Sequence, residues 1–335
     1  MMMQNDRGRS QVVAALNEAS RLLLVGHVSP DGDSMGSLFG LSLALTALGK
    51  DVTVFVEGGV PDKYRFLPGA ETAVADPARL PTETVTLVVL DCGEFERTGL
   101  PEYPFRALPT INIDHHRTSQ GFGEASYIDS AAAATGELVL AVLSGLDVQL
   151  DADIATCLYT AIASDTGFFQ YSNTTASVHR AIAQLLDFGA RQQLVAQSLG
   201  QKTPQYLQLL ALVLQRIETF ADGLGAYSWL THEDLLRLEA DGSMTEGLVD
   251  YPRSLAGVEL AFLLTETSPG VCKLSLRSQQ RADVSQLAQE FGGGGHARAA
   301  GATIDGQPRA VIQRVVSSAD RSIRECLNHT DSSTC

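Results

Sequence analysis

The stretch TINIDHH, residues 110–116, carries a short apolar run straight into one aspartate and two histidines. Two earlier stretches have the same form: TLVVLDCG (residues 86–93) runs into Asp91, and RLLLVGHV (residues 21–28) reaches His27. The carboxyl ends of parallel strands meet at one edge of an open sheet, and ligands bind there. These stretches therefore predict a parallel sheet with acidic and imidazole side chains gathered along one edge.

The first half of the chain alternates predicted strands and helices, which indicates an α/β fold with a mostly parallel sheet flanked by helices. Apart from the three stretches above, we expect a strand over residues 51–57 and helices over about residues 34–48, 136–144, 151–163 and 175–188. The pattern changes at Thr203-Pro204, a cap and a first-turn proline that open another helix. Strands over residues 225–230, 258–265 and 272–277, with helices after Asp283 and from about Pro308, then predict a smaller α/β domain.

The length of 335 residues fits two domains of about 150 residues each. We expect a catalytic domain over residues 10–195, a helical linker over residues 196–218, and a smaller substrate-binding domain over residues 219–328. A composition that is 44% hydrophobic and 19% charged is typical of a globular protein.

Charge and cysteine usage exclude several classes of protein. The net charge is −15, and residues 1–190 hold 11 Lys and Arg against 23 Asp and Glu, a balance of −12. A protein that coats long duplex nucleic acid needs a basic face, so that class is excluded. The five cysteines are widely spaced and form no CxxC pair, which argues against disulfides and zinc knuckles and favours the cytoplasm. The apolar runs are too short to span a membrane, and the polar N-terminus does not have the form of a secretory signal.

Eight acidic and histidine side chains form the candidate metal site: His27, Asp31, Asp33, Asp91, Asp114, His115, His116 and Asp165. Each one alone is typical of a turn, a helix cap or a buried histidine. Together the carboxylates would repel one another unless cations lay between them. Two divalent ions meet that need, because carboxylate and imidazole ligands suit Mn²⁺, with Mg²⁺ or Co²⁺ as alternatives. Such a pair, about 3.5–4 Å apart, can activate water and neutralise phosphate oxygens.

A second candidate site is the glycine-rich stretch GGGGHAR, residues 292–298. Glycines let a ligand approach the backbone closely, and successive free N–H groups can hold a phosphate. A flexible hairpin loop is the alternative. Between residues 273 and 324, Lys and Arg outnumber Asp and Glu, although the whole chain is acidic. We therefore expect metal ions on the first domain and a substrate clamp on the second.

The motifs HVSPDGDS, DCG, IDHH and ASDTGFFQYSNT resemble, in order, the four motifs of the DHH phosphoesterase superfamily. The later GGGGHARAAGA resembles the signature of its DHHA1 C-terminal domain. In length and in its compact second domain, the chain is most similar to the oligoribonuclease and pAp phosphatase type, also called NrnA-like. The resemblance implies a DHH catalytic domain, a DHHA1 substrate-binding domain and a homodimer. It also implies hydrolysis of very short oligonucleotides, of 3′-phosphoadenosine 5′-phosphate (pAp), or of linear and cyclic diadenylate.

Carried over position by position, the resemblance implies a set of metal ligands and a set of catalytic residues. The metal ligands are His27 and Asp31 for one ion, Asp33, His115 and Asp165 for the other, and Asp91 between the two. The catalytic residues are Asp91, Asp114 and His116. In this assignment Asp114 orients a ligand histidine and His116 faces the substrate phosphate.

The implied substrate-binding residues are His116, Arg277, Ser278, Gly293, Gly294, Gly295, His296 and Arg298. Three neighbours of the motifs have open roles. Cys92 is either a reactive thiol or, as we expect, an inert buried one. Arg97 either orients the loop after Asp91 or lies on the surface, and Arg117 meets either substrate or solvent.

Three other activities are weighed against the leading prediction, a two-metal hydrolase of short oligonucleotides and pAp. One is a cyclic di-AMP phosphodiesterase. Another is a RecJ-like single-strand exonuclease, although such enzymes are usually longer and carry a further nucleic-acid-binding domain. The third is a catalytically dead nucleotide-binding protein, which the full set of ligands disfavours. The sequence does not choose among nanoRNA, pAp, pApA and cyclic di-AMP.

Overall fold

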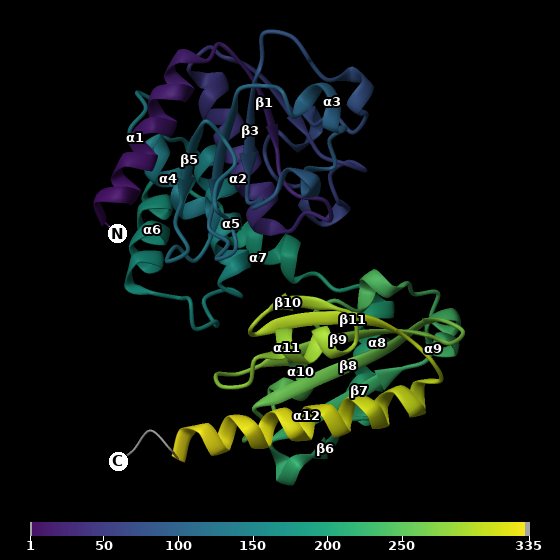
Figure 1. The fold of residues 1–335 in the computed structure, drawn as a ribbon. Coiled ribbons are helices and arrows are strands. Elements are labelled where there is room, and N and C mark those ends of the chain that lie inside the picture. The colour runs from purple at the N-terminus through teal and green to yellow at the C-terminus, as the bar shows by residue number, and fades with distance from the viewer. Residues whose placement is uncertain (1, 332–335) are drawn as a thin grey trace. The chain divides into compact units, whose positions relative to one another are not determined.

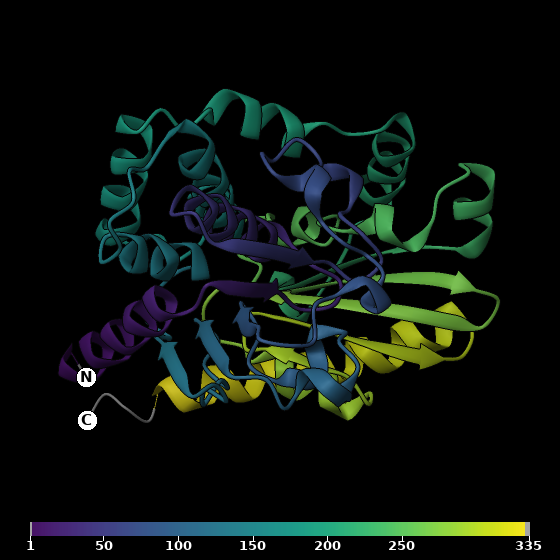
Figure 2. The same ribbon diagram turned by 90° about the horizontal axis from the view of Figure 1, so that it is seen from above.

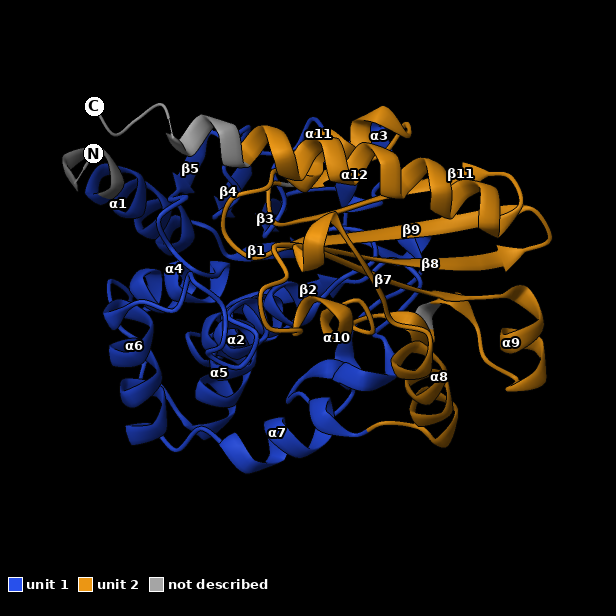
Figure 3. Ribbon diagram, turned by 90° about the horizontal axis from the view of Figure 1, so that it is seen from below, with its two compact units in different colours: residues 1–201 blue, residues 202–335 orange. Residues whose placement is uncertain are grey.

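The computed structural model (Figure 1) describes residues 2–331, without the side chains of residues 2–5, 243, 296 and 327–331. The chain divides into two compact units, residues 1–201 and residues 202–335 (Figure 3). This division falls within residues 196–218, the stretch predicted as a linker. The predicted bounds of the three parts stay a prediction. None of the helices within residues 2–331 has the length and apolar character needed to cross a membrane.

The first unit is built on one five-stranded parallel sheet in the order β2-β1-β3-β4-β5 (Figure 3). Its strands are β1 (Arg21–Val25), β2 (Asp51–Phe55), β3 (Thr86–Leu90), β4 (Thr110–Asp114) and β5 (Ala125–Ile128). Its helices are α1 (Met2–Glu18), α2 (Gly32–Ala47), α3 (Glu102–Phe105), α4 (Thr135–Leu143), α5 (Ala152–Asp165), α6 (Ala176–Asp187) and α7 (Gln192–Gly200). The predicted α/β fold with a mostly parallel sheet is confirmed.

Both faces of this sheet are buried, and neighbouring strand residues pack on opposite sides. In β1, Leu22 and Leu24 belong to the larger core, to which α2, α4, α5 and α6 contribute. Leu23 and Val25 belong to a smaller core on the other side. Side chains alternate along a strand, so burial on both faces requires the continuous apolar runs seen in the sequence.

The strand order reverses between β1 and β3, which are neighbours in the sheet. The chain leaves β1 through α2 to reach β2 on one side and returns to β3 on the other. Ligands of doubly wound sheets bind at such a reversal, beyond the carboxyl ends of the strands. His27 follows β1 by two residues and Asp91 follows β3 directly, so both lie at this point of the sheet.

Close packing of α2 on α5 brings the acidic start of one helix near the acidic end of the other. A Cβ atom on Gly36 would lie 2.3 Å from the carbonyl oxygen of Cys157 and 2.7 Å from the amide nitrogen of Ala161. At the first residue of α2, a Cβ atom on Gly32 would lie 1.9 Å from Oγ of Ser164. Because only glycine leaves room for this approach, these two positions set the distance between the helices.

The second unit has a six-stranded sheet in the order β10-β11-β9-β8-β7-β6, antiparallel except between β7 and β8. Its strands are β6 (Glu218–Phe220), β7 (Gly225–Leu230), β8 (Leu260–Ser268), β9 (Val271–Ser278), β10 (Gly294–His296) and β11 (Ala299–Asp305). Its helices are α8 (Pro204–Gln215), α9 (His232–Arg237), α10 (Asp250–Arg253), α11 (Val284–Glu290) and α12 (Pro308–Asp331). This sheet matches the smaller α/β domain predicted from the sequence.

Two separate cores hold the second sheet. Phe262 and Leu276 pack with α11 and α12, and Leu263 packs with α8 and α9. Figure 2 shows α12 (yellow) lying alongside the strands of this sheet. The alternation along β8 therefore serves a layer of helices on each face of this sheet.

We expect Gly36→Ala to lower the stability of the protein by about 1–3 kcal/mol, because the added methyl group meets backbone atoms of α5 that cannot rotate away. Gly200→Ala is the matched control, since a Cβ atom there has no described atom within 4 Å. Urea unfolding of both variants in EDTA gives the comparison. Equal unfolding midpoints for Gly36→Ala and the wild-type protein would contradict this account of the α2–α5 contact.

Candidate metal centre

The carboxylate of Asp33 joins the beginnings of two helices. Asp33 lies in the first turn of α2 and is fully buried. Its Oδ2 accepts a hydrogen bond from the backbone N–H of Thr135 at 2.6 Å, and its Oδ1 accepts one from Gly136 at 3.0 Å. These N–H groups begin α4, whose N-cap residue, Ala134, has no side-chain oxygen. Asp33 therefore caps α4 from a distant part of the chain, where the helix dipole also favours a negative charge.

A first group of candidate metal ligands consists of His27, Asp31 and Asp91. Nε2 of His27 lies 3.4 Å from Oδ2 of Asp91 and 3.9 Å from Oδ1 of Asp31. The other ring nitrogen, Nδ1, lies 2.8 Å from the carbonyl oxygen of Val28. A carbonyl oxygen can only accept, so Nδ1 carries the hydrogen and Nε2 of the neutral ring is free to bind a metal ion.

A second group consists of Asp33, His115 and Asp165. Nε2 of His115 lies 3.2 Å from Oδ2 of Asp165 and 3.6 Å from Oδ2 of Asp33. Its Nδ1 lies 3.4 Å from the carbonyl oxygen of Ala132. As in the first group, the ring presents Nε2 to carboxylates while Nδ1 faces a backbone acceptor.

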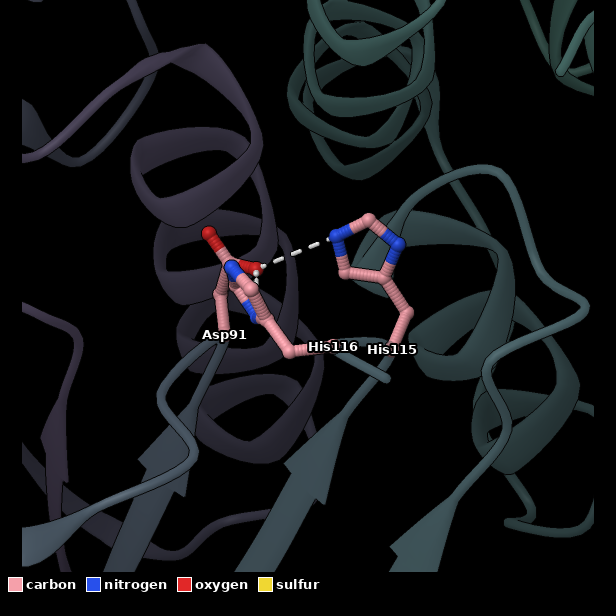
Figure 4. A group of neighbouring side chains, drawn as sticks. All are labelled: Asp91, His115 and His116. Carbon is pink, nitrogen blue, oxygen red and sulfur yellow. Dashed lines mark ion pairs between the residues drawn. The ribbon is translucent and has the colours of Figure 1, made fainter. Parts of the chain in front are cut away.

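Asp91 lies between the two groups, with one carboxylate oxygen toward each. Oδ2 faces His27 as described, and Oδ1 lies 3.6 Å from Nε2 of His115 and 3.7 Å from Nδ1 of His116 (Figure 4). Oδ1 also accepts a hydrogen bond from the hydroxyl of Thr135 at 3.1 Å. The backbone of Asp91 has a left-handed φ of 55°, which turns the chain as it leaves β3. A carboxylate placed in this way is suited to bridging two ions, and the bridging role stays a prediction.

The pKa values of this cluster reflect burial and crowded charge. Burial, with the negative charge of Asp165, raises the pKa of Asp33 to about 8. Burial, with the charge of Asp33, also raises the pKa of Asp91 well above its usual range. Burial alone would lower the pKa of His115, but the hydrogen bond to Asp165 and the nearby carboxylates raise it to about 10. The cluster therefore favours bound positive charge, as protons or as metal ions.

Asp114 pairs with His116, and not with the predicted ligand His115. Nδ1 of His116 lies 2.7 Å from Oδ1 of Asp114, and the backbone N–H of His116 donates to the same oxygen at 3.3 Å. Burial would raise the pKa of Asp114, but the hydrogen bond and charge of His116 outweigh it and the pKa is lowered. An ionised Asp114 thus fixes the His116 ring with Nδ1 protonated.

Three residues that support the site, Thr135, Gly136 and Ser37, were not predicted from the sequence. Thr135 and Gly136 act largely through backbone N–H groups, which every residue except proline has. Ser37 donates its hydroxyl to Oδ1 of Asp33 at 3.1 Å. Ser37 lies one helical turn after Asp33, so the spacing of four residues within a predicted helix could have identified it.

Of the three residues with open roles, Cys92 is buried, and Arg97 and Arg117 are exposed. Cys92 is fully buried, its thiol donates to the carbonyl of Glu94, and burial raises its pKa to about 11, so it is the expected inert thiol. The side chains of Arg97 and Arg117 are exposed. The carbonyl of Arg97 accepts a 2.7 Å hydrogen bond from Val28, so its backbone holds the loop that carries His27.

In the second unit, two of the predicted substrate-binding side chains lie together and one faces elsewhere. Ser278 is buried and donates its hydroxyl to the carbonyl of Ala282 at 2.7 Å. The guanidinium of Arg298 donates to the same carbonyl and lies 3.4 Å from the Ser278 hydroxyl. Arg277 precedes Ser278 in β9 and therefore faces the opposite side of the sheet. Its guanidinium donates to the carbonyl of Leu276.

The glycine run has a clear structural use. Gly292 and Gly293 end α11 by donating their N–H groups to the carbonyls of Gln289 and Ala288, at 3.0 and 2.9 Å. These two N–H groups are therefore not free for a phosphate, which corrects the prediction of successive free donors. Gly294 and Gly295 lie in β10 beside β11. The side chain of His296 lies outside the described part of the structure. The binding roles of Gly293, Gly294, Gly295, His296, Arg298, Arg277 and Ser278 stay predictions.

Comparisons with known proteins agree with this geometry. The N-terminal domain model of the DHH family matches residues 21–162, and the DHHA1 domain model matches residues 226–325. The bifunctional oligoribonuclease and PAP phosphatase NrnA of Thermus thermophilus is 36% identical over 286 residues, which cover 85% of this chain and 84% of that protein. The chain belongs to the DHH family.

Other relatives in the DHH family include the cyclic-di-AMP phosphodiesterase PdeA of Listeria monocytogenes. It is 27% identical over 88% of this chain, but the match covers only 47% of PdeA. The crystal structure of an exopolyphosphatase-related protein of Bacteroides fragilis has a TM-score of 0.86 and 26% identity, covering 94% of this chain and 97% of that one. The predicted family and the predicted enzyme class, a phosphoric ester hydrolase, are confirmed.

DHH phosphoesterases depend on divalent metal ions, and the residues present here fit such ions. The two groups offer oxygen atoms of carboxylates together with Nε2 atoms of histidines whose Nδ1 atoms face backbone carbonyls. Ligands of this kind suit divalent first-row metals. His27, Asp31 and Asp91 would hold one ion, and Asp33, His115 and Asp165, with Asp91, would hold the other.

We expect the metal-free protein to lose stability as pH rises from 7 to 9. Asp33 and His115 both have pKa values that are raised in the folded state, to about 8 and about 10. Protons held only by the folded protein stabilise it at low pH, and this contribution is lost as pH rises through those values. A loss of about 1 kcal/mol would lower the Tm by about 2–4 °C.

Thermal unfolding in EDTA at pH 7, 8 and 9 tests this expectation. Added Mn²⁺ should raise the Tm at each pH and reduce the decline, because ions that bind only the folded state stabilise it. A Tm in EDTA that stays constant or rises from pH 7 to pH 9 would contradict the assignment of buried charge.

Proposed function

We propose that this protein hydrolyses short oligoribonucleotides and 3′-phosphoadenosine 5′-phosphate with the help of two divalent metal ions. The observation that carries the proposal is the placement of Asp91, a buried carboxylate with one oxygen toward each of two groups of acidic and imidazole ligands. The NrnA relative, a named oligoribonuclease and PAP phosphatase that is 36% identical over most of both chains, supports the same activity.

Two divalent ions, when bound, supply the positive charge that activates water and neutralises the oxygens of a phosphate. The protein holds the ligands for these ions rigidly, since Asp33 is fixed by two backbone N–H groups and Asp91 by the Thr135 hydroxyl. His116 is held by Asp114 beside Asp91. We assign His116 to the substrate phosphate, where it donates a hydrogen bond or protonates the leaving oxygen.

Mn²⁺ is the metal that we propose. Each group combines carboxylates with one imidazole, and imidazole nitrogen favours Mn²⁺ over Mg²⁺, which prefers oxygen ligands and retains its waters. Co²⁺ is the alternative with the same ligand preference. We also propose that the protein is cytoplasmic and that it forms a homodimer. Light scattering of the purified protein at several concentrations would test the dimer.

The second unit is proposed to bind the substrate through Arg298 and the stretch from Gly293 to His296, and a contact from Arg277 would come from the other side of the sheet. The guanidinium of Arg298 donates a hydrogen bond to the carbonyl of Ala282, and the residue is exposed to solvent. An anion can therefore reach the guanidinium without a change in the conformation of the side chain. A pre-oriented guanidinium loses less conformational entropy when it binds a phosphate.

Cyclic di-AMP phosphodiesterase activity is the second candidate. The observation that favours it is the likeness to PdeA, which extends over 88% of this chain. Cyclic di-AMP and pApA share the same phosphodiester chemistry, so the same metal groups would serve both. The two candidate activities differ in whether the substrate needs a free 5′ end, which cyclic di-AMP lacks and pApA has. A comparison of the rates on these two substrates distinguishes the activities.

The substrate panel is the main test. We expect metal-free protein resupplied with Mn²⁺ to hydrolyse pAp and oligoribonucleotides of two to five residues. The rate should fall steeply for a fifty-mer, because the charge of −12 on residues 1–190 repels a long polyanion. Cyclic di-AMP is included as a separate substrate, and Mg²⁺ and Co²⁺ as separate metals. Equal kcat/KM for a dimer and a fifty-mer would favour an exonuclease of the RecJ type instead.

Asp91→Asn tests the two-metal assignment. The amide keeps the shape of the side chain but loses the charge, so we expect kcat/KM with Mn²⁺ to fall by about 10²–10³ or more. Asp187→Asn, on an exposed aspartate of α6, is the matched control and should retain wild-type activity. Circular dichroism checks that both variants fold. A folded Asp91→Asn protein with near-wild-type turnover would exclude Asp91 as a ligand of both ions.

A further inference from the structure

The peptide groups on either side of Ala133 are held by two side chains. The backbone N–H of Ala133 donates to Oε2 of Glu137 at 2.8 Å. The carbonyl oxygen of Ala133 accepts a hydrogen bond from Nδ2 of Asn173 at 3.3 Å. Residues 132–136, which we call the α4 entry loop, are therefore fixed at their centre from both sides.

The α4 entry loop contacts two members of the second metal group. The carbonyl oxygen of Ala132 lies 3.4 Å from Nδ1 of His115. At the other end of the loop, the N–H groups of Thr135 and Gly136 bind the carboxylate of Asp33. A shift of the loop would therefore displace a histidine and an aspartate together.

Asn173 links this loop to the third member of the group. Its Nδ2 also donates to the backbone carbonyl of Asp165 at 3.0 Å. Both partners of Nδ2 are carbonyl oxygens, so only the NH₂ end of the amide can face them. Oδ1 of Asn173 is buried and has no hydrogen-bond partner among the described residues. An aspartate at this position would direct a carboxylate oxygen at two carbonyls.

We infer that Asn173 and Glu137 are positioning residues that hold Asp33, His115 and Asp165 in one arrangement. Asn173 occurs in the stretch ASDTGFFQYSNT, from which the sequence assigned a role to Asp165 alone. Neither side chain is among the candidate metal ligands. They contact the second metal group through this loop, and they reach the first group, His27 and Asp31 with Asp91, only through the hydroxyl of Thr135.

Removal of the groups that orient metal ligands typically weakens metal affinity by about 10- to 100-fold. We expect Asn173→Asp and Asn173→Ala to weaken one of two Mn²⁺ sites by a factor in this range and to weaken the other less, since only the hydroxyl of Thr135 joins the loop to Asp91. Glu137→Ala should do the same. Glu137→Gln should be closer to wild type, because its amide oxygen can still accept from Ala133.

The inference rests on the proposed two-metal function, and the experiment separates the two. Calorimetric titration with Mn²⁺ gives the number and affinity of sites in the wild-type protein and each variant. Asn17→Ala, an exposed asparagine on α1, is the matched control. Thermal unfolding in EDTA shows whether a variant has lost stability apart from metal binding. The ratio of kcat to KM at low and high Mn²⁺ gives a further readout, and high Mn²⁺ should restore kcat.

Selective loss of one Mn²⁺ site, with unchanged unfolding in EDTA and recovery of kcat at high Mn²⁺, would support the inference. Wild-type affinity at both sites in folded Asn173→Asp and Glu137→Ala would overturn it and leave the proposed function intact. Equal weakening of both sites would also overturn it. A wild-type protein that binds no Mn²⁺ would overturn the proposed function and the inference together. If Asn173→Asp does not fold, the comparison of Glu137→Ala with Glu137→Gln decides.

Discussion

The buried carboxylate of Asp33 has two roles that constrain everything around it. It accepts the first N–H groups of α4, and it faces His115 as a candidate metal ligand. Both roles require the first turn of α2 to lie beside the first turn of α4. Glycines let both helices approach α5 closely, since Gly36 of α2 meets its backbone and a Cβ atom on Gly136 of α4 would lie 2.6 Å from Cβ of Ala161. The geometry of the candidate metal site therefore depends on how the three helices α2, α4 and α5 pack together.

The cluster concentrates negative charge, and its members Asp33 and Asp91 are buried away from water. Burial and mutual repulsion raise the pKa values of Asp33 and Asp91, and nearby carboxylates raise that of His115. Hydrogen bonds from the backbone and from Thr135 compensate part of this cost, but they leave the cluster in need of cations. Stability and metal binding are therefore coupled here, as in other sites that are assembled by folding.

The glycine-rich stretch of the second unit shows how a motif can serve structure as well as function. Gly292 and Gly293 close α11, and a Cβ atom on Gly293 would lie 2.1 Å from the carbonyl oxygen of Gly301. The run is needed for the tight passage from α11 into β10, whatever it binds. The exposed guanidinium of Arg298, held on the carbonyl of Ala282, is the feature of this region best prepared for an anion.

The pattern of residues along the chain predicted the α/β fold, the parallel sheet, and the gathering of acidic and histidine side chains at its edge. It could do so because burial on both faces of a sheet requires continuous apolar runs, and because Asp91 and His115 stand where such runs end. It also carried the family resemblance, through motifs that are contiguous in the chain. How these side chains are held could be seen only in the folded chain. Asp33 meets Thr135 and Gly136, about a hundred residues further on, through backbone N–H groups. Almost every residue has such a group, so no residue type marks the contact. The two hydrogen bonds from Asn173 to backbone carbonyls likewise depend on where the folded chain brings its backbone.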